Sequence, residues 1–227
     1  MLDETGIWYQ STPMKSPILT IILLAPALAF GQKFQDASAK GSPLSLSIKI
    51  DSDDGKPYIH AHSNSPKGVL ALVAFITFSY GKGQVAPLTT NQDYAFKLEP
   101  LKLGEERDIA PAYLDPEPGA KITEAVGQVL FVQYEDGSTW GNLEAAKRLL
   151  DSRPQKLAFL KHLVETYYES GQGPFDAILN DPKLPFAPES IVAGCLKAEA
   201  EYQKTTPIDL AKKQLAAAQG WHASGIF

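Results

Sequence analysis

Two histidines with the spacing of a metal site lie in the segment Tyr58–Ser63, which reads Y-I-H-A-H-S. In a β-strand, residues two apart project to the same face, so His60 and His62 would direct both imidazoles to one side. Imidazole nitrogen is a preferred ligand of zinc and copper. The pair predicts a metal-binding protein or a metal-dependent enzyme, with a carboxylate or His222 as third ligand. A merely polar strand face is the competing interpretation, because the local sequence specifies no third ligand.

Three aromatic residues suggest a second kind of site. Tyr134, Trp140 and Trp221 could form a binding surface on which sugar rings stack, because aromatic rings offer large flat apolar faces. This carbohydrate-binding hypothesis requires the three rings to be exposed and coplanar. Packing of the same rings inside the fold is the alternative.

The chain contains none of the short motifs that position a catalytic nucleophile, a zinc-bound water or a nucleotide phosphate. G-x-S-x-G, H-E-x-x-H, Walker A and G-x-G-x-x-G are all absent from the sequence. The adjacent acids Glu105-Glu106 and Glu135-Asp136 would point to opposite faces of a strand, so neither pair predicts an acid/base couple. No catalytic residue and no cofactor is predicted, which favours a non-enzymatic role.

The overall composition is that of a globular protein. Of the 227 residues, 44% are hydrophobic and 21% are charged, and the net charge is −5 without any run of lysine or arginine. The lack of a basic patch predicts no nucleic-acid partner. A single cysteine, Cys195, excludes an intrachain disulfide and is interpreted as a small apolar residue on a helix face.

Residues 14–31 read M-K-S-P-I-L-T-I-I-L-L-A-P-A-L-A-F-G, the pattern of a secretory signal peptide. One lysine precedes an apolar run that ends in small residues, and cleavage is expected after Ala29 or Gly31. Residues 1–13 contain two acids, which is unusual before a signal segment, so we expect translation to begin at Met14. Residues 1–31 are thus interpreted as an N-terminal extension plus signal peptide. The mature protein is expected to be periplasmic or secreted, without a membrane span.

Residues 32–42 lack periodicity and are interpreted as a flexible lead-in, whereas residues 43–141 show strand patterns. Alternation predicts a half-buried strand at 44–50, and the uncharged run 69–80 predicts a central strand covered on both faces. A further strand is expected around Tyr94–Leu98. About seven short strands separated by turns predict an antiparallel β-sandwich.

The segment Val126–Gly141, V-G-Q-V-L-F-V-Q-Y-E-D-G-S-T-W-G, predicts the last hairpin of this β region. Strict alternation would place Val126, Gln128, Leu130, Val132 and Tyr134 on one face and the intervening residues on the other. Asp136-Gly137 predicts a type I′ turn, which requires positive φ at both central residues.

Three stretches together resemble immunoglobulin-like domains of exported, largely uncharacterised bacterial proteins. They are N-S-P-K-G-V-L-A (64–71), L-K-L-G-E (101–105) and the segment 126–141. The resemblance covers about residues 44–141 and contains strands and turns but no catalytic residue. It implies an Ig-like fold and an extracytoplasmic setting, and no activity.

Residues 142–227 change to helical spacing, so the predicted fold class is α+β, an N-terminal antiparallel Ig-like sandwich followed by a helical region. Asn142 and Thr206-Pro207 are expected to begin helices. Apolar stripes are expected on three of the helices, listed here in chain order: Leu157, Leu160, Val164 and Tyr168; Ile191, Cys195, Ala198 and Tyr202; Ile208, Ala211, Leu215 and Ala218. The leading hypothesis is an exported non-enzymatic protein that acts through contact with another protein of unknown identity.

Overall fold

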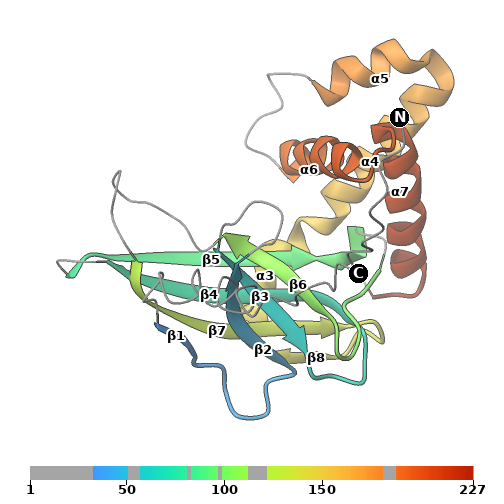
Figure 1. Cartoon of the computed structure of the whole chain (residues 1–227). Helices are drawn as coiled ribbons and strands as arrows, with labels where there is room; N and C mark the ends of the chain where they lie inside the picture. Colours follow the sequence, from blue (N-terminus) through green and yellow to red (C-terminus); the bar gives the residue numbers. More distant parts are fainter. Residues whose placement is uncertain are drawn as a thin grey trace, which may run out of the picture. The chain divides into compact units, whose positions relative to one another are not determined.

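The computed structural model describes residues 33–50, 57–80, 83–96, 99–111, 122–180 and 188–226. The extension, the signal-type segment at 14–31 and Met14 lie outside these ranges. The chain from Lys33 onward is one compact unit, in which strands come first and helices follow. The mixed α and β composition with helices toward the C-terminus is therefore confirmed (Figure 1). The strands are β1 (Lys33–Asp36), β2 (Leu44–Ile50), β3 (Pro57–Ser63), β4 (Val69–Tyr80), β5 (Val85–Asp93), β6 (Glu106–Pro111), β7 (Ile122–Tyr134) and β8 (Thr139–Gly141).

The strands form two sheets that enclose a common core. The larger sheet has the order β1-β7-β4-β5, with β8 also paired to β7, and the smaller has the order β2-β3-β6. All pairs are antiparallel except β1 with β7, which is parallel. The core cluster draws side chains from both sheets, among them Leu44, Leu46, Ile59, Leu72, Ile76, Phe78, Val129 and Val132. Burial of these apolar faces is the main force that holds the sheets together.

The expected flexible lead-in contains a strand. Lys33–Asp36 pairs with β7, and the ring of Phe34 packs against the inter-sheet core. An Asp36 carboxylate oxygen accepts a hydrogen bond from the backbone N–H of Leu46 at 2.8 Å. Four residues are too few to show an alternating pattern, so the strand exists through its tertiary partners and the sequence gives no sign of it.

Segment 85–96 also differs from expectation. The structure has strand β5 at Val85–Asp93, while Tyr94–Phe96 form a short 3₁₀ helix, η2, instead of the expected strand. Pro87 obscured β5 in the sequence, but proline is tolerated on a strand at the edge of a sheet. Tyr94 and Phe96 are both buried, in two different clusters.

Strand β7 does not alternate along its whole length. Its register with β4 pairs Val73 with Phe131 and Ala74 with Val129, which leaves Leu130 as an extra residue. This β-bulge exchanges the two faces of the strand. Val129 and Val132, predicted to lie on opposite faces, therefore share the core between the sheets, while Phe131 packs on the helical side.

The hairpin that joins β7 to β8 is present, but its turn is not type I′. Among residues 134–138 only Gly137 has positive φ, at 81°. The Gly137 N–H donates to the carbonyl of Tyr134 at 3.0 Å, and the Tyr134 N–H donates to the carbonyl of Ser138 at 2.9 Å. A three-residue loop with a left-handed glycine fits this pattern.

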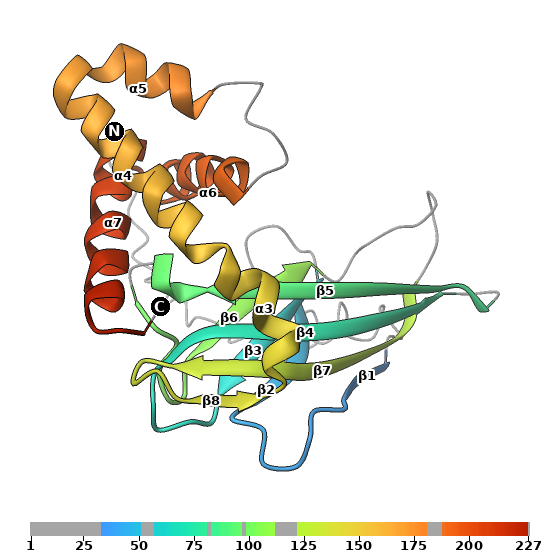
Figure 2. The same cartoon turned by 180° about the vertical axis from the view of Figure 1, so that it is seen from behind.

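The helices follow the strands, and the first of them lies against the outer face of the larger sheet (Figure 2). Their bounds are α3 (Leu143–Asp151), α4 (Arg153–Ser170), α5 (Gln172–Leu179), α6 (Pro188–Tyr202) and α7 (Pro207–Ala223). As predicted, Asn142 and Thr206 cap helices through their side chains. Ala146 and Leu149 of α3 pack on Ala71, Val73 and Phe131, and a larger cluster joins Leu70 and Phe96 to α4–α7. No helix in the described part of the chain is long and apolar enough to cross a membrane.

The apolar stripes were predicted with mixed success. The α7 stripe of Ile208, Ala211, Leu215 and Ala218 is buried throughout. In α4, Leu160 and Val164 are buried but Tyr168 is 69% exposed. In α6 the prediction is wrong, because Val192, Ala193, Leu196 and Ala200 are buried while Cys195 and Tyr202 are exposed. An alanine-rich helix offers two apolar faces, and only packing against α4 and α7 selects one of them.

Candidate functional site

The polar residues most able to bind a ligand lie on the outer face of the smaller sheet. On β3, Ile59 and Ala61 are fully buried in the core between the sheets. The residues between and beside them, Tyr58, His60 and His62, therefore point away from that core. The structure thus places His60 and His62 on one face, next to the neighbouring strands β2 and β6.

A β-bulge brings Asp108 opposite His60. Ile59 pairs with Ala110, but His60 pairs with Asp108, so the register shifts by one residue between these pairs. Without the bulge Ile109 would face His60, and Asp108 would belong to the other face. Instead the Asp108 carboxylate lies 2.8 Å from Nδ1 of His60, whose side chain is only 13% exposed.

This contact determines which nitrogen of His60 carries a lone pair. In the neutral imidazole, the Nδ1 hydrogen is donated to the Asp108 carboxylate, so Nε2 is left as the acceptor. Nε2 of His60 is buried, and no described group donates a hydrogen bond to it. A buried acceptor without a donor is uncommon in folded proteins.

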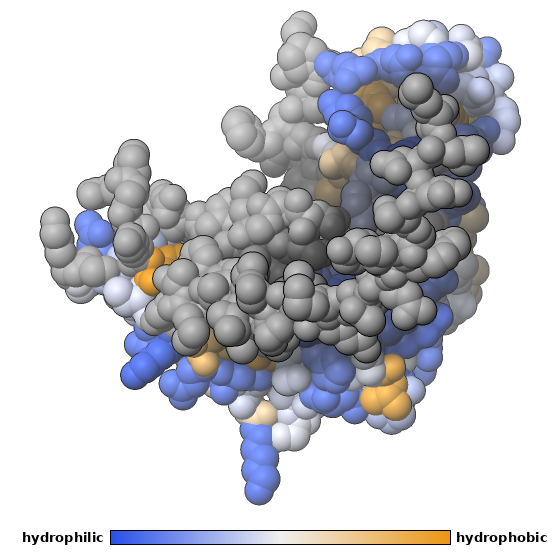
Figure 3. All heavy atoms as spheres, viewed as in Figure 1, coloured by the Kyte–Doolittle hydropathy of each residue, from blue (hydrophilic) through white to orange (hydrophobic). Residues whose placement is uncertain are grey.

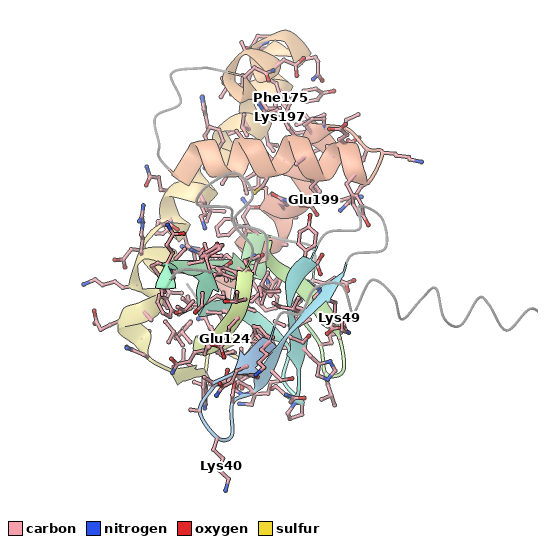
Figure 4. The ribbon with its side chains drawn as sticks, turned by 60° about the vertical axis from the view of Figure 1, so that its left-hand side comes forward. Lys40, Lys49, Glu124, Phe175, Lys197 and Glu199 are labelled. Carbon is pink, nitrogen blue, oxygen red and sulfur yellow. The ribbon has the colours of Figure 1, made fainter. Side chains whose placement is uncertain are left out.

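Glu106 and Lys49 complete the cluster. Glu106 pairs in register with His62, and its carboxylate accepts a hydrogen bond from the ammonium group of Lys49 across the sheet. That hydrogen bond is the main cause that holds the pKa of Glu106 below its usual value, and the positive charge of Lys49 acts in the same direction. Ser47 of β2 also approaches Glu106, with 3.4 Å between Oγ and Oε1. Figure 4 shows Lys49 among the strands, apart from the helices.

The present side-chain positions do not form a complete metal centre. Within the described ranges, no three histidine, cysteine or acidic side chains are already gathered around one point. His222, the alternative third ligand, lies near the end of α7 and is not gathered with the pair in any such group of described residues. The histidine pair remains a prediction, and the structure adds Asp108, Glu106 and Lys49 to its surroundings.

The three aromatic residues pack against two different clusters. Tyr134 and Trp140 are half-buried and pack against the core between the sheets, whereas Trp221 packs against the helical core. Burial raises the pKa of Tyr134, whose ring also lies 5.5 Å from the Lys67 ammonium group. Each ring contributes to the packing of its cluster, and the sugar-stacking hypothesis stays a prediction.

Sequence reasoning missed the acidic partners of the histidines. Glu106 and Asp108 lie two residues apart on β6, the same spacing as His60 and His62 on β3. That parallel spacing was a usable signal once both segments were interpreted as strands. The bulge that sets their register was not visible, because nothing in the two segments specifies which residues face each other.

Comparison with known proteins adds no further constraint. No protein-family model, no curated protein sequence and no solved structure matches this chain.

Proposed function

We propose that this chain is an exported, non-enzymatic protein with an Ig-like β-sandwich and a C-terminal helical region, and that it acts by binding another protein. Three features support the proposal: the signal-type segment at 14–31, the two sheets around a common core, and the Ig-like motifs in 64–71, 101–105 and 126–141. In this proposal the sheets supply a rigid support and the helices present the contact surface.

The exposure of two tyrosines on the helices is the observation that favours a contact role. Tyr168 at the end of α4 is 69% exposed and Tyr202 at the end of α6 is 81% exposed. Tyrosine is enriched at protein interfaces, because it combines a large apolar ring with a polar group and loses little side-chain entropy on binding. The ammonium group of Lys212 lies 4.9 Å from the Tyr168 ring and holds a positive charge beside it.

The rest of the visible surface is consistent with a small, mixed interface. On the face seen in Figure 3, apolar residues outside the grey atoms occur in separate groups between polar ones. Interfaces of proteins that also exist free in solution are about as polar as the remaining surface. We therefore expect a moderate-affinity partner held by a few aromatic anchors.

The contact hypothesis can be tested by affinity capture with the full chain recovered after export. We expect the wild-type protein to retain a specific partner and the Tyr168→Ala/Tyr202→Ala variant to lose it, with an unchanged melting temperature. Leu103→Ala is the matched control, since Leu103 is 61% exposed but lies in the β region. Equal capture by all three forms would contradict the assignment to the helical tyrosines.

Export is tested separately by sequencing the N-terminus of the protein from the extracytoplasmic fraction. Cleavage after Ala29 or Gly31 predicts a mature chain that begins at Phe30 or Gln32. Retention of the whole protein in the cytoplasm with residues 14–31 intact would refute this part of the proposal.

A further inference from the structure

The outer face of the β2-β3-β6 sheet has the chemistry of a transition-metal site, and we propose that His60, His62 and Glu106 bind one divalent ion of the zinc class. This proposal is independent of the protein-contact function. It goes beyond the sequence hypothesis in three respects. Glu106 is the third ligand, Asp108 orients His60, and the ammonium group of Lys49 is the cation that now pairs with Glu106.

His60 is prepared to act as a ligand through Nε2. Its other ring nitrogen is engaged by Asp108 at 2.8 Å, which is the usual outer contact of a metal-binding histidine. Such a carboxylate fixes the tautomer and the ring orientation, and it raises the basicity of the free nitrogen. Nε2 of His60 is buried and receives no hydrogen bond from any described group, so a metal ion would supply its missing partner.

The strand geometry brings two more donors to the same side. His62 follows two residues later on β3, so its imidazole leaves the sheet in the same direction as that of His60. Glu106 lies directly opposite His62 on the adjacent antiparallel strand. Two ligands at i and i+2 and a third across the ladder can converge on one ion, because directly opposed Cβ atoms are about 4.5–5.5 Å apart.

The carboxylate of Glu106, the acidic ligand in this set, is already paired with a cation. The Lys49 ammonium group binds the Glu106 carboxylate, and its side chain is 52% exposed. Lys49 therefore can swing into solvent and release the carboxylate. With this ion pair in place, no three ligands in the described ranges are gathered around one point.

The donor types select the class of metal. Two imidazole nitrogens and one carboxylate oxygen favour zinc and its neighbours in the first transition row over calcium or magnesium, which prefer oxygen ligands alone. Three protein ligands also leave one position of a tetrahedral ion open to water. The site would thus resemble an accessible metal centre more than a closed structural one.

The test is a calorimetric titration of the full chain, without a histidine tag, using ZnCl₂ after treatment with a chelator. We expect one equivalent to bind and His62→Ala or Glu106→Gln to weaken binding at least tenfold. Asp108→Asn should weaken binding about 10–100-fold, and Asp108→Glu should restore part of it. The tetrahedral absorption bands of bound Co²⁺ should shift in the Asp108 variants, which a purely structural role would not cause.

Two variants make the test specific. Lys49→Ala should bind zinc more tightly than the wild-type protein, because it removes the competing ammonium group. His162→Ala is the control for adventitious binding, since His162 is exposed on α4. Melting temperatures identify variants that fail to fold. If the variants at positions 62, 106 or 108 fail to fold, the exposed positions 49 and 162 still test the proposal. Three outcomes would each overturn the proposal. They are no zinc uptake by the folded wild-type protein, a loss of zinc affinity in His162→Ala as large as in His62→Ala, and weaker zinc binding in Lys49→Ala.

Discussion

Arg153 and Asp93 form a buried ion pair that joins the helices to the larger sheet. Nε and Nη2 of Arg153 donate to the two carboxylate oxygens of Asp93 at 3.1 and 2.9 Å, and neither side chain is more than 7% exposed. The remaining guanidinium nitrogen, Nη1, donates a hydrogen bond to the side-chain oxygen of Gln133 at 2.7 Å. Arg153 begins α4, Asp93 ends β5 and Gln133 lies on β7. The planar guanidinium therefore fixes three elements relative to one another.

Removal of one member of this pair should destabilise the whole chain. Asp93→Asn leaves the buried Arg153 guanidinium without its carboxylate partner, which costs about 3–5 kcal/mol. Arg153→Met should cost less, because Lys156 Nζ still lies 3.5 Å from the Asp93 carboxylate. The measurement is urea denaturation followed by circular dichroism. The double variant Asp93→Asn/Arg153→Met should lose less than the sum of the two single variants, because it also removes the guanidinium charge that Asp93→Asn alone leaves without a carboxylate. Strictly additive losses would show that the pair contributes no coupling energy.

Gln133 should be needed to hold the C-terminal segment. Its Nε2 donates to the carbonyl of Ile226 at 3.2 Å while its oxygen accepts from Arg153. Gln133→Leu removes the hydrogen bonds that Gln133 makes with Nη1 of Arg153 and with the part-buried Ile226 carbonyl, so we expect a loss of about 1–3 kcal/mol and faster digestion of the tail by carboxypeptidase. Gln128→Leu is the matched control, since Gln128 lies on the same strand but is exposed. Equal digestion rates in both variants would contradict this role.

Two glycines should respond in opposite directions to alanine. Gly141 has a φ of 89°, and an added Cβ would lie 2.3 Å from the backbone oxygen of Leu130, so Gly141→Ala should lower the free energy of unfolding by about 2 kcal/mol or more. Gly220 lies inside α7 with open space around it, so Gly220→Ala should raise that energy by about 0.5–1 kcal/mol. Thermal unfolding of both variants checks the contrast. An unchanged free energy of unfolding in Gly141→Ala would refute the close approach of Gly141 to the Leu130 backbone.

The turn residue Gly137 offers a related test of the hairpin. Its φ of 81° suits glycine, and a β-branched residue resists this conformation. Gly137→Val should therefore lower the melting temperature, whereas Gly137→Asn, which tolerates the left-handed region, should lower it less. An identical melting temperature for the wild-type and valine forms would refute the hairpin assignment.

The carboxyl group of Asp136 should titrate unusually low because of Lys67. The Lys67 ammonium group lies 2.6 Å from Asp136 and, with hydrogen bonds from Ser138, lowers the Asp136 pKa from 3.8 to about 2. A lowered folded-state pKa means that the stabilising contribution is present above pH 3.8 and is lost as the pH falls toward 2. Carbon-13 NMR titration should show Lys67→Met moving the Asp136 pKa upward. A pKa that stays near 2 would assign the shift to Ser138.

Sequence reasoning located the elements with one clear local signal. The alternation of Leu44 and Leu46, the cap at Asn142 and the stripe of α7 each depend on neighbours within a few residues, and the structure confirms them. It failed at β1, β5 and the buried face of α6, where a short length, a proline or an alanine-rich helix left the pattern ambiguous.

The amino-acid sequence by itself determined that strands precede helices and that His60 and His62 share a spacing of two on one strand. The tertiary structure decided which residues face them. A bulge opposite His60 selects Asp108 over Ile109, and a second bulge at Leu130 moves Val132 to the face of Val129. Register between strands depends on contacts between residues far apart in the chain, and one extra residue exchanges the faces, so local periodicity cannot specify it.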